Sequence, residues 1–299
     1  MNVRLSLIYS RVVFCAKYLY RIYTISRLMN KEKLVLFYQQ GWECEWAGKL
    51  DKNYYPRTKT YENRMLDTLS FIYEKEDSTF TVLDVGCGIG IYSFALLSRF
   101  KNAHVVGIDL SQKQIDFISE QAKRFSFKDR GTFLQADAEN FSLKSKFDYI
   151  ICTELLEHLP DPRKALKNIL LHGHKRTKFI FSVPHIYGAG ASGWFFRQYR
   201  KDNDWIETQK KEDIDFSKPY YEFYHHEYVL EEAKKLLEES GFVVEKAVFC
   251  NFNFKNRYIT YAYSQISTRS IDMLFNRLTN NKRASQITLL CSSEKPVNS

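Results

Sequence analysis

The segment VLDVGCGIG, residues 82–90, holds the residues whose types and spacing most directly suggest chemistry. An apolar run carries Asp84 near its end, and Gly86, Gly88 and Gly90 follow at alternate positions before a second apolar run. Glycines at such a turn let the backbone bend sharply and approach a ligand, because no Cβ stands in the way. We interpret this segment as a ligand-binding loop between a buried strand and a helix.

This loop differs from the G-x-G-x-x-G loop of dinucleotide-binding folds, which places a pyrophosphate at a helix N-terminus. The glycines are spaced G-x-G-x-G, and position 91 is Ile. Asp84 precedes the loop, where its carboxylate would repel a pyrophosphate. The same carboxylate suits a ligand that bears an ammonium group and no phosphate.

Two further acidic residues follow the next two predicted strands. Asp109 lies nineteen residues after Gly90, a position from which a carboxylate can accept hydrogen bonds from both ribose hydroxyls. Asp137 follows in LQADAEN, where it and the Ala138 backbone could meet the edge of an adenine. A single Asp is often a turn residue. Three at the carboxyl ends of parallel strands, together with the glycine loop, predict a nucleoside site.

The elements that must position these residues alternate between short apolar strands and longer helices. We expect strands at 79–85, 104–110, 131–137, 147–153, 177–183, 242–249 and 286–292, and helices at 61–73, 91–100, 111–125 and 230–242. Ser111 is the expected N-cap of the third helix, and a Gly is expected to end the last one. The pattern predicts an α/β fold with a Rossmann-like, seven-stranded, mostly parallel sheet and helices on both faces.

The remaining segments divide the chain further. We predict a basic, aromatic and helical N-terminal extension at 1–60, a main domain at 61–292 and a short tail at 293–299. Two insertions, at about 184–224 and 251–284, interrupt the main domain. Long loops in compact domains are often lids or binding elements, although they can also be surface excursions.

With these motifs the sequence resembles the class I S-adenosylmethionine-dependent methyltransferases over roughly 79–183. In that family the glycine loop holds the methionine end of the cofactor, the second-strand acid binds ribose, and the Asp-Ala pair contacts adenine. The resemblance therefore implies these cofactor-binding residues: Asp84, Gly86, Cys87, Gly88, Gly90, Asp109, Leu110, Asp137 and Ala138.

Later segments are similar to the subgroup that contains ubiquinone-biosynthesis O-methyltransferases. They are FDYIICTELLEHLPDP, SVPH and HHEYVLEEAKKLLEESGF. Because this subgroup acts on many small molecules, the similarity implies methyl transfer, with oxygen as the favoured acceptor atom, without naming the acceptor.

Glu154, Glu157 and His158 leave three interpretations open. If Glu154 starts a helix, all three project from one face. They could then bind magnesium, as an E-x-x-E-H segment does in some quinone O-methyltransferases and in methyltransferases of small-RNA 3′ ends, with His225 or His226 completing the site. Alternatively, His158 is a general base for an acceptor hydroxyl. The third interpretation is structural, with the acids at a helix N-terminus.

His185 follows the fifth predicted strand and is a second candidate catalytic residue. The His225–His226 pair could face the acceptor in the same way. An aromatic run in the first insertion is expected to line an apolar acceptor site. Its members are Trp194, Phe195, Phe196, Tyr199 and Trp205.

Composition constrains the cellular setting and the partners. The formal net charge of +9 favours anionic partners. The six cysteines are scattered without a C-x-x-C pair, which is typical of a reducing compartment, so we expect a cytoplasmic protein. Residues 1–28 are basic and apolar with no acidic residue. They predict either peripheral contact with an anionic membrane or a helix that packs on protein.

The sequence thus predicts an enzyme that methylates a small-molecule, lipid or glycan acceptor. The basic charge and the E-x-x-E-H segment leave RNA 2′-O-methylation with a divalent metal as an alternative, although no separate RNA-binding module or basic stripe is visible. A non-catalytic scaffold of the same fold, which binds a membrane or partner through its N-terminal segment, is the other alternative.

Overall fold

A computed structural model describes residues 59–159, 161–185, 227–252, 274 and 284–294. Its elements follow the chain in this order: α4 (Lys59–Leu69), β1 (Thr79–Val85), α5 (Ile91–Arg99), β2 (Asn102–Asp109), α6 (Gln112–Arg124), β3 (Gly131–Gln135), β4 (Phe147–Thr153), the 3₁₀ helix η1 (Leu156–His158), α7 (Pro162–Leu171), β5 (Gly173–Pro184), α11 (Leu230–Glu239), β6 (Phe242–Phe252) and β7 (Ala284–Ser293).

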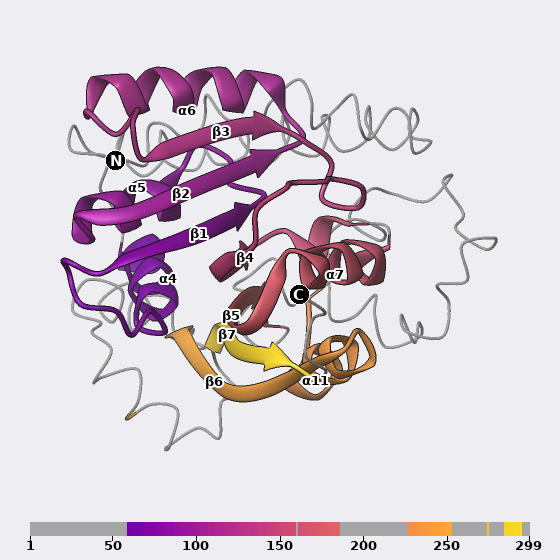
Figure 1. The fold of residues 1–299 in the computed structure, drawn as a ribbon. Helices are drawn as coiled ribbons and strands as arrows, with labels where there is room; N and C mark the ends of the chain where they lie inside the picture. Colours follow the sequence, from indigo (N-terminus) through magenta and orange to yellow (C-terminus); the bar gives the residue numbers. More distant parts are fainter. Residues whose placement is uncertain (1–58, 160, 186–226, 253–273, 275–283, 295–299) are drawn as a thin grey trace, which may run out of the picture.

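The strands form one seven-stranded sheet in the order β3-β2-β1-β4-β5-β7-β6 (Figure 1). Strands β1 to β5 pair in parallel. Strand β7 lies between β5 and β6 and runs antiparallel to both. The predicted seven-stranded, mostly parallel sheet is therefore confirmed. Its strand order reverses between β1 and β4, which is where open α/β sheets bind ligands.

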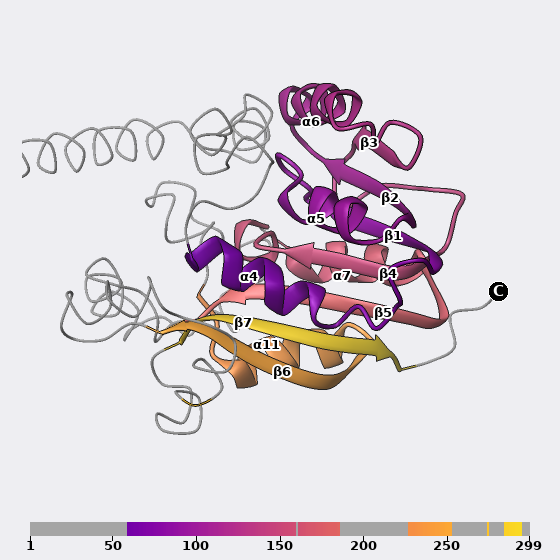
Figure 2. The ribbon, with the colours of Figure 1, turned by 90° about the vertical axis from the view of Figure 1, so that its left-hand side faces the viewer.

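Helices cover both faces of the sheet, as predicted. Figure 2 shows α4 and α5 in front of the sheet and α7 and α11 behind it. Side chains of α4, α5 and α6 share one buried apolar cluster with one face of the sheet. Side chains of α7 and α11 share the other cluster with the opposite face. The sheet is thus buried on both sides, which explains why its strands are nearly continuous apolar runs.

Two of the predicted helix ends are confirmed and one is wrong. Ser111 caps α6, since its Oγ accepts a hydrogen bond from Gln114 N at 3.3 Å. Gly241 follows α11 with φ of 94°, a conformation that favours glycine. The helix expected to run to residue 73 ends at Leu69. There the chain tightens, because Phe71 N and Ile72 N bond to carbonyls only three residues back.

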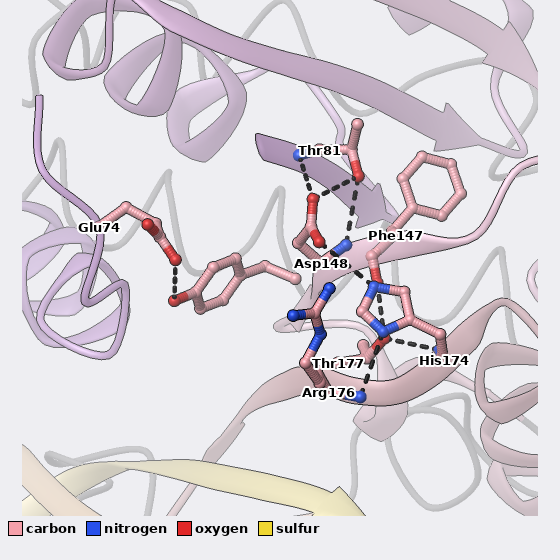
Figure 3. A network of polar contacts seen from close by, with 8 residues as sticks. Glu74, Thr81, Phe147, Asp148, His174, Arg176 and Thr177 are labelled. Atoms are coloured by element: carbon pink, nitrogen blue, oxygen red, sulfur yellow. Dashed lines mark hydrogen bonds and ion pairs between the residues drawn. The ribbon is translucent and has the colours of Figure 1, made fainter. Parts of the chain in front are cut away.

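A polar network joins β1, β4 and β5 at their amino ends, away from the loop after β1 (Figure 3). Asp148 Oδ2 accepts hydrogen bonds from Thr81 N at 2.8 Å and from Thr81 Oγ1 at 3.0 Å. Asp148 Oδ1 lies 3.2 Å from His174 Nε2. His174 Nδ1 accepts from Arg176 N at 3.1 Å, so the neutral ring carries its hydrogen on Nε2 and donates it to Asp148. The network cross-links these three strands at the end of the sheet opposite the candidate ligand site.

We expect Asp148→Asn to destabilise the fold in a pH-dependent way. Partial burial raises the pKa of Asp148, but the hydrogen bonds from Thr81 and His174 outweigh it and lower this pKa below its ordinary value. The stabilisation is therefore present above the pKa of the unfolded chain and is lost as the pH falls through the folded pKa. Because Asp148 is partly exposed, we expect a loss of about 1 kcal/mol in unfolding free energy at neutral pH. Urea unfolding at pH 7 and pH 3 measures it, and an equal loss at both pH values would contradict this explanation.

Candidate active site

The loop after β1 is held in place by the end of β2. Gly86 N and Cys87 N both donate to Ile108 O, at 2.8 and 2.9 Å. Gly88 N donates to Asp109 Oδ2 at 2.9 Å. The φ angles of Gly86, Gly88 and Gly90 are 75°, 53° and 85°, values that side chains with a Cβ rarely adopt. The glycines are thus needed for the shape of the turn itself.

Asp109 occupies the position predicted for a ribose-binding acid, at the end of β2. Its Oδ1 accepts from Ser111 N at 2.9 Å, while its Oδ2 accepts from Gly88 N. The carboxylate therefore joins the glycine loop to the N-terminus of α6. Its side chain is only half-buried, so it can still face a ligand.

Asp84 differs from Asp109 because it is completely buried. Its Oδ2 accepts from Ser93 Oγ at 2.6 Å, which ties β1 to α5. Its Oδ1 is also buried, and within the described part of the chain no group hydrogen-bonds to it. Burial raises the pKa of Asp84 to about 7 because it outweighs the hydrogen bonds from Ser93, which lower this pKa, and the nearby Asp109 adds a smaller repulsion that also raises it.

These observations test whether the loop fits the implied cofactor. A buried carboxylate oxygen without a donor, close to a second carboxylate, favours a cation and repels a phosphate. S-adenosylmethionine carries an ammonium and a sulfonium and has no phosphate. The residues therefore fit that cofactor and disfavour a dinucleotide.

We expect Asp84→Asn to separate stability from cofactor binding. In the wild type the folded pKa lies above the unfolded one, so stability falls as the pH rises from about 4 to about 7. Asn does not titrate, so the stability of the variant relative to the wild type should increase over that range. Its affinity for S-adenosylhomocysteine, which keeps the ammonium, should be lower at pH 8. Urea unfolding and calorimetric titration check the two parts, and a pH-independent stability difference would count against the buried carboxyl.

The predicted adenine-contacting pair lies beside Asp109. Ala136 N donates to Asp109 O at 2.9 Å, which brings the segment after β3 next to the end of β2. Asp137 is half-buried, and its Oδ1 accepts from Glu139 N at 2.9 Å. Ala138 is buried, and its carbonyl accepts from Asn168 Nδ2 at 3.3 Å. The predicted positions thus gather along one edge of the sheet, at the carboxyl ends of β1, β2 and β3.

The condition attached to the metal interpretation, that Glu154 starts a helix, is not met. Glu154 has a φ of 52° and follows the last residue of β4, and its N–H donates to Ser182 O at 3.1 Å. Only residues 156–158 form a single 3₁₀ turn. Glu154, Glu157 and His158 therefore do not project from one helical face. A left-handed backbone at a residue other than glycine costs roughly 1–3 kcal/mol and persists only where the surroundings hold it.

Three donors hold the Glu154 carboxylate, and all come from other elements. Oε2 accepts from Arg64 of α4 at 2.7 Å. Oε1 accepts from Ser182 Oγ of β5 at 3.0 Å and from Gln286 Nε2 of β7. None of these three partners, Arg64, Ser182 and Gln286, was predicted. No local motif marks them, since Gln286 is 132 residues from Glu154.

Register explains why these polar groups meet. Thr153 of β4 pairs with Ser182 of β5, which pairs with Thr288 of β7. The preceding row on the same face is apolar, with Ile151, Ile180 and Leu290. The sheet face thus changes from aliphatic to hydroxyl-bearing near the carboxyl end of β4. Thr153, Ser182 and Thr288 are each a single hydroxyl residue inside an apolar run. This pattern is the sequence signal that could have predicted the polar surface.

Glu157 and His158 lie in different environments. Glu157 is almost fully buried, and burial, helped by the neighbouring Glu154, raises its pKa well above the ordinary value. His158 is partly exposed, with Nε2 3.9 Å from Glu157 Oε1. Within the described residues no three His, Cys, Asp or Glu side chains are grouped to hold a metal. His225 and His226 lie outside those residues, so the four-residue metal site stays a prediction.

His185, the second candidate catalytic residue, is buried at the end of β5. Its Nδ1 lies 2.9 Å from Ala284 O, and its ring packs edge-on against Phe249. Burial lowers the pKa of His185, so the ring is neutral at pH 7. Its surroundings explain a packing role, and its catalytic role stays a prediction.

Comparison with known proteins defines the class to which this fold and site belong. The family model described as "Methyltransferase domain" matches residues 76–241. The chain therefore belongs to this family of methyltransferase domains, and the resemblance to class I S-adenosylmethionine-dependent methyltransferases is confirmed.

Individual relatives agree on the class. The ubiquinone biosynthesis O-methyltransferase of Coxiella burnetii is 37% identical over 106 residues, which cover 34% of this chain and 42% of that protein. The match thus spans less than half the length of this relative.

Solved structures share the fold. An S-adenosylmethionine-dependent methyltransferase from Clostridium acetobutylicum aligns with a TM-score of 0.50 at 18% identity, over 79% of this chain and 92% of that one. Phosphoethanolamine N-methyltransferase 2 of Haemonchus contortus aligns with a TM-score of 0.51 at 16% identity, over 78% of this chain and 53% of that one. One relative is named for oxygen as acceptor and one for nitrogen, so the fold does not decide the acceptor atom.

Some predictions fall where the structure gives no description. Residues 1–28, the aromatic run at 194–205 and most of both insertions lie outside the described residues. Among the helices that are described, none has the length and apolar character needed to cross a membrane.

Proposed function

We propose that this protein transfers the methyl group of S-adenosylmethionine to a hydroxyl oxygen of a small-molecule, lipid or glycan acceptor. The observation that carries the cofactor part is the glycine loop held between Asp84 and Asp109. One carboxylate is buried next to the turn, and the other fixes the turn through Gly88 N. This arrangement suits a cationic amino acid joined to a nucleoside.

The candidate cofactor residues would contact successive parts of the ligand along one edge of the sheet. Asp84 and the loop of Gly86, Cys87, Gly88 and Gly90 would meet the amino-acid end. Asp109 and Leu110 would meet the ribose, and Asp137 and Ala138 the adenine. The bound cofactor supplies a methyl group on a sulfonium, which is already activated. The protein then has mainly to hold the acceptor in line with that group, which is catalysis by proximity and orientation.

Oxygen as the acceptor atom is supported by the similarity to the Coxiella burnetii O-methyltransferase. It is also supported by the partly exposed Glu154 carboxylate at the carboxyl end of β4, which can accept a hydrogen bond from a hydroxyl. His158 is likewise partly exposed and remains a candidate base.

Magnesium, and with it RNA methylation, has less support from the described residues. Arg64 holds Glu154 at 2.7 Å, and a cation at that distance opposes a second one on the same carboxylate. A non-catalytic scaffold would not need a glycine loop with carboxylates suited to a cationic cofactor, so this interpretation has less support as well.

Transfer of an isotope-labelled methyl group tests the proposal. The full chain is incubated with labelled S-adenosylmethionine and separate lipid, glycan, quinone-like and RNA extracts, with and without EDTA. Mass spectrometry then locates the added methyl. We expect label on oxygen in a non-RNA extract, with or without EDTA. Label only on RNA, only on nitrogen, or in no extract would overturn the acceptor proposal.

A further inference from the structure

We infer that Glu154 is a catalytic residue that binds the acceptor hydroxyl and receives its proton, and that Arg64, Ser182 and Gln286 are positioning residues for it. This inference rests on the proposed methyl transfer to oxygen. It gives Glu154 a role different from metal binding or helix capping, and it places the acceptor at the carboxyl end of β4.

The position of Glu154 links it to the cofactor loop. Leu155, the next residue, packs on Gly86, where a Cβ would lie 3.0 Å from Leu155 Cδ2. On the other side, Tyr92 is close enough to Glu154 and Thr153 for both side chains to influence the pKa of its hydroxyl. Tyr92 lies in the first turn of α5, directly after the loop. Glu154 is thus placed between the two parts of the chain that border the methionine end of the cofactor site.

The carboxylate has capacity for one more hydrogen bond. A carboxylate has about four lone-pair sites, two on each oxygen. Ser182 and Gln286 occupy Oε1, and Arg64 occupies one site on Oε2. The fourth site, on Oε2, has no partner within the described residues. The side chain is 24% exposed, so a ligand can reach it.

Three of the neighbouring ionisable groups do not compete for this role, and the partly exposed His158 is the rival base. Glu157 is almost fully buried, so an acceptor cannot reach it, and burial raises the pKa of the Tyr92 hydroxyl above its ordinary value, so that hydroxyl stays protonated at neutral pH. His185 is buried against Phe249. Glu154 combines exposure with a fixed orientation. Exposure lets the acceptor reach the carboxylate, and the fixed orientation means that the carboxylate loses little conformational freedom when the acceptor binds.

The left-handed backbone of Glu154 supports function over a purely structural role. Strained conformations of this kind concentrate at sites of chemistry. A structural ion pair with Arg64 would not need a left-handed backbone, since a long Glu side chain can reach an Arg from ordinary backbone angles. Here the bond from Glu154 N to Ser182 O and the three side-chain contacts together hold both backbone and carboxylate.

The proposed step balances as follows. The acceptor oxygen forms a bond to the methyl carbon, and the bond between that carbon and the donor sulfur breaks with its electron pair left on sulfur. The hydroxyl proton moves to Oε2 of Glu154 and is later released to solvent. Neutralising the carboxylate leaves Arg64 with an uncompensated charge, which favours that release.

Glu154→Gln tests the inference with the methyl-transfer assay and the extract that the wild type methylates. Removing a general base lowers rates by roughly 100-fold to 10,000-fold, so we expect kcat to fall at least 100-fold. The Kd for S-adenosylhomocysteine, measured by calorimetry, should be unchanged. Glu154→Asp keeps a carboxylate and should restore part of kcat. Arg64→Met should raise KM for the acceptor and lower kcat less than Glu154→Gln does.

Glu239→Gln is the matched control, because it breaks a surface ion pair of similar length, 2.9 Å to Arg163, on the opposite face of the sheet. Its kcat should equal that of the wild type. Near-wild-type kcat in Glu154→Gln, or equal losses in the Gln and Asp variants with native unfolding curves, would overturn the inference. Absence of transfer by the wild type itself would instead refute the proposed function.

Discussion

Asp109→Ala is expected to weaken cofactor binding roughly 100-fold while the protein remains folded. The substitution removes the acceptor for Gly88 N and for Ser111 N, and it removes the carboxylate proposed to bind ribose. The two ribose hydroxyls would each lose a hydrogen bond to a charged group, worth about 1.5 kcal/mol, and together this corresponds to a roughly 100-fold weaker Kd. Calorimetric titration with S-adenosylhomocysteine measures the change.

Asp116→Ala is the control for this experiment. Asp116 also lies on the α6 side of the loop, but it is exposed and accepts a hydrogen bond from Gln112, four residues before it in the same helix. Its removal should leave the Kd unchanged. Should Asp109→Ala bind as tightly as the wild type, neither the loop nor the ribose assignment could stand.

Gly90→Ala is expected to cause the largest loss of stability among single substitutions in the loop. Gly90 has a φ of 85°, which costs an Ala about 1–2 kcal/mol. A Cβ there would lie 2.2 Å from Ile118 Cδ1 and 2.7 Å from its Cγ1. Ile118 is fully buried, so it cannot move away without disturbing its neighbours. Crowding adds about 1–3 kcal/mol, for a total of about 2–5 kcal/mol in urea unfolding.

A second substitution separates the two causes. Ile118→Val removes Cδ1, so Gly90→Ala combined with Ile118→Val should lose less stability than the sum of the single changes. Gly131→Ala serves as a comparison, because its nearest neighbour would lie at 3.1 Å. Its cost should be smaller. Strict additivity at positions 90 and 118 would contradict the steric explanation.

The sequence was sufficient for the parts of this fold that depend on local patterns. The glycine spacing and the alternation of strands and helices predicted the loop, the seven strands and the helices on both faces. The positions of Asp84, Asp109 and Asp137 followed as well, because the carboxyl ends of parallel strands meet at one edge. The burial of Asp84 did not follow, since Ser93 is brought over it by the packing of α5 on the sheet.

The surroundings of Glu154 could not be predicted because they are non-local. Arg64 precedes it by 90 residues and Gln286 follows it by 132, and neither spacing is a pattern in the chain. Gln286 reaches Glu154 only because β7 inserts antiparallel between β5 and β6. The condition that Glu154 starts a helix failed, because its N–H continues the pairing of β4 with β5 through Ser182 O and its backbone is left-handed.

The central claim, that the turn after β1 is shaped to bind a cationic nucleoside, is tested most directly by titrating the full chain with S-adenosylhomocysteine in a calorimeter. Binding of one molecule per chain, which NADH and ATP fail to displace, is the expected result. A well-folded protein that gives no binding heat, or that prefers NADH, would contradict the whole account.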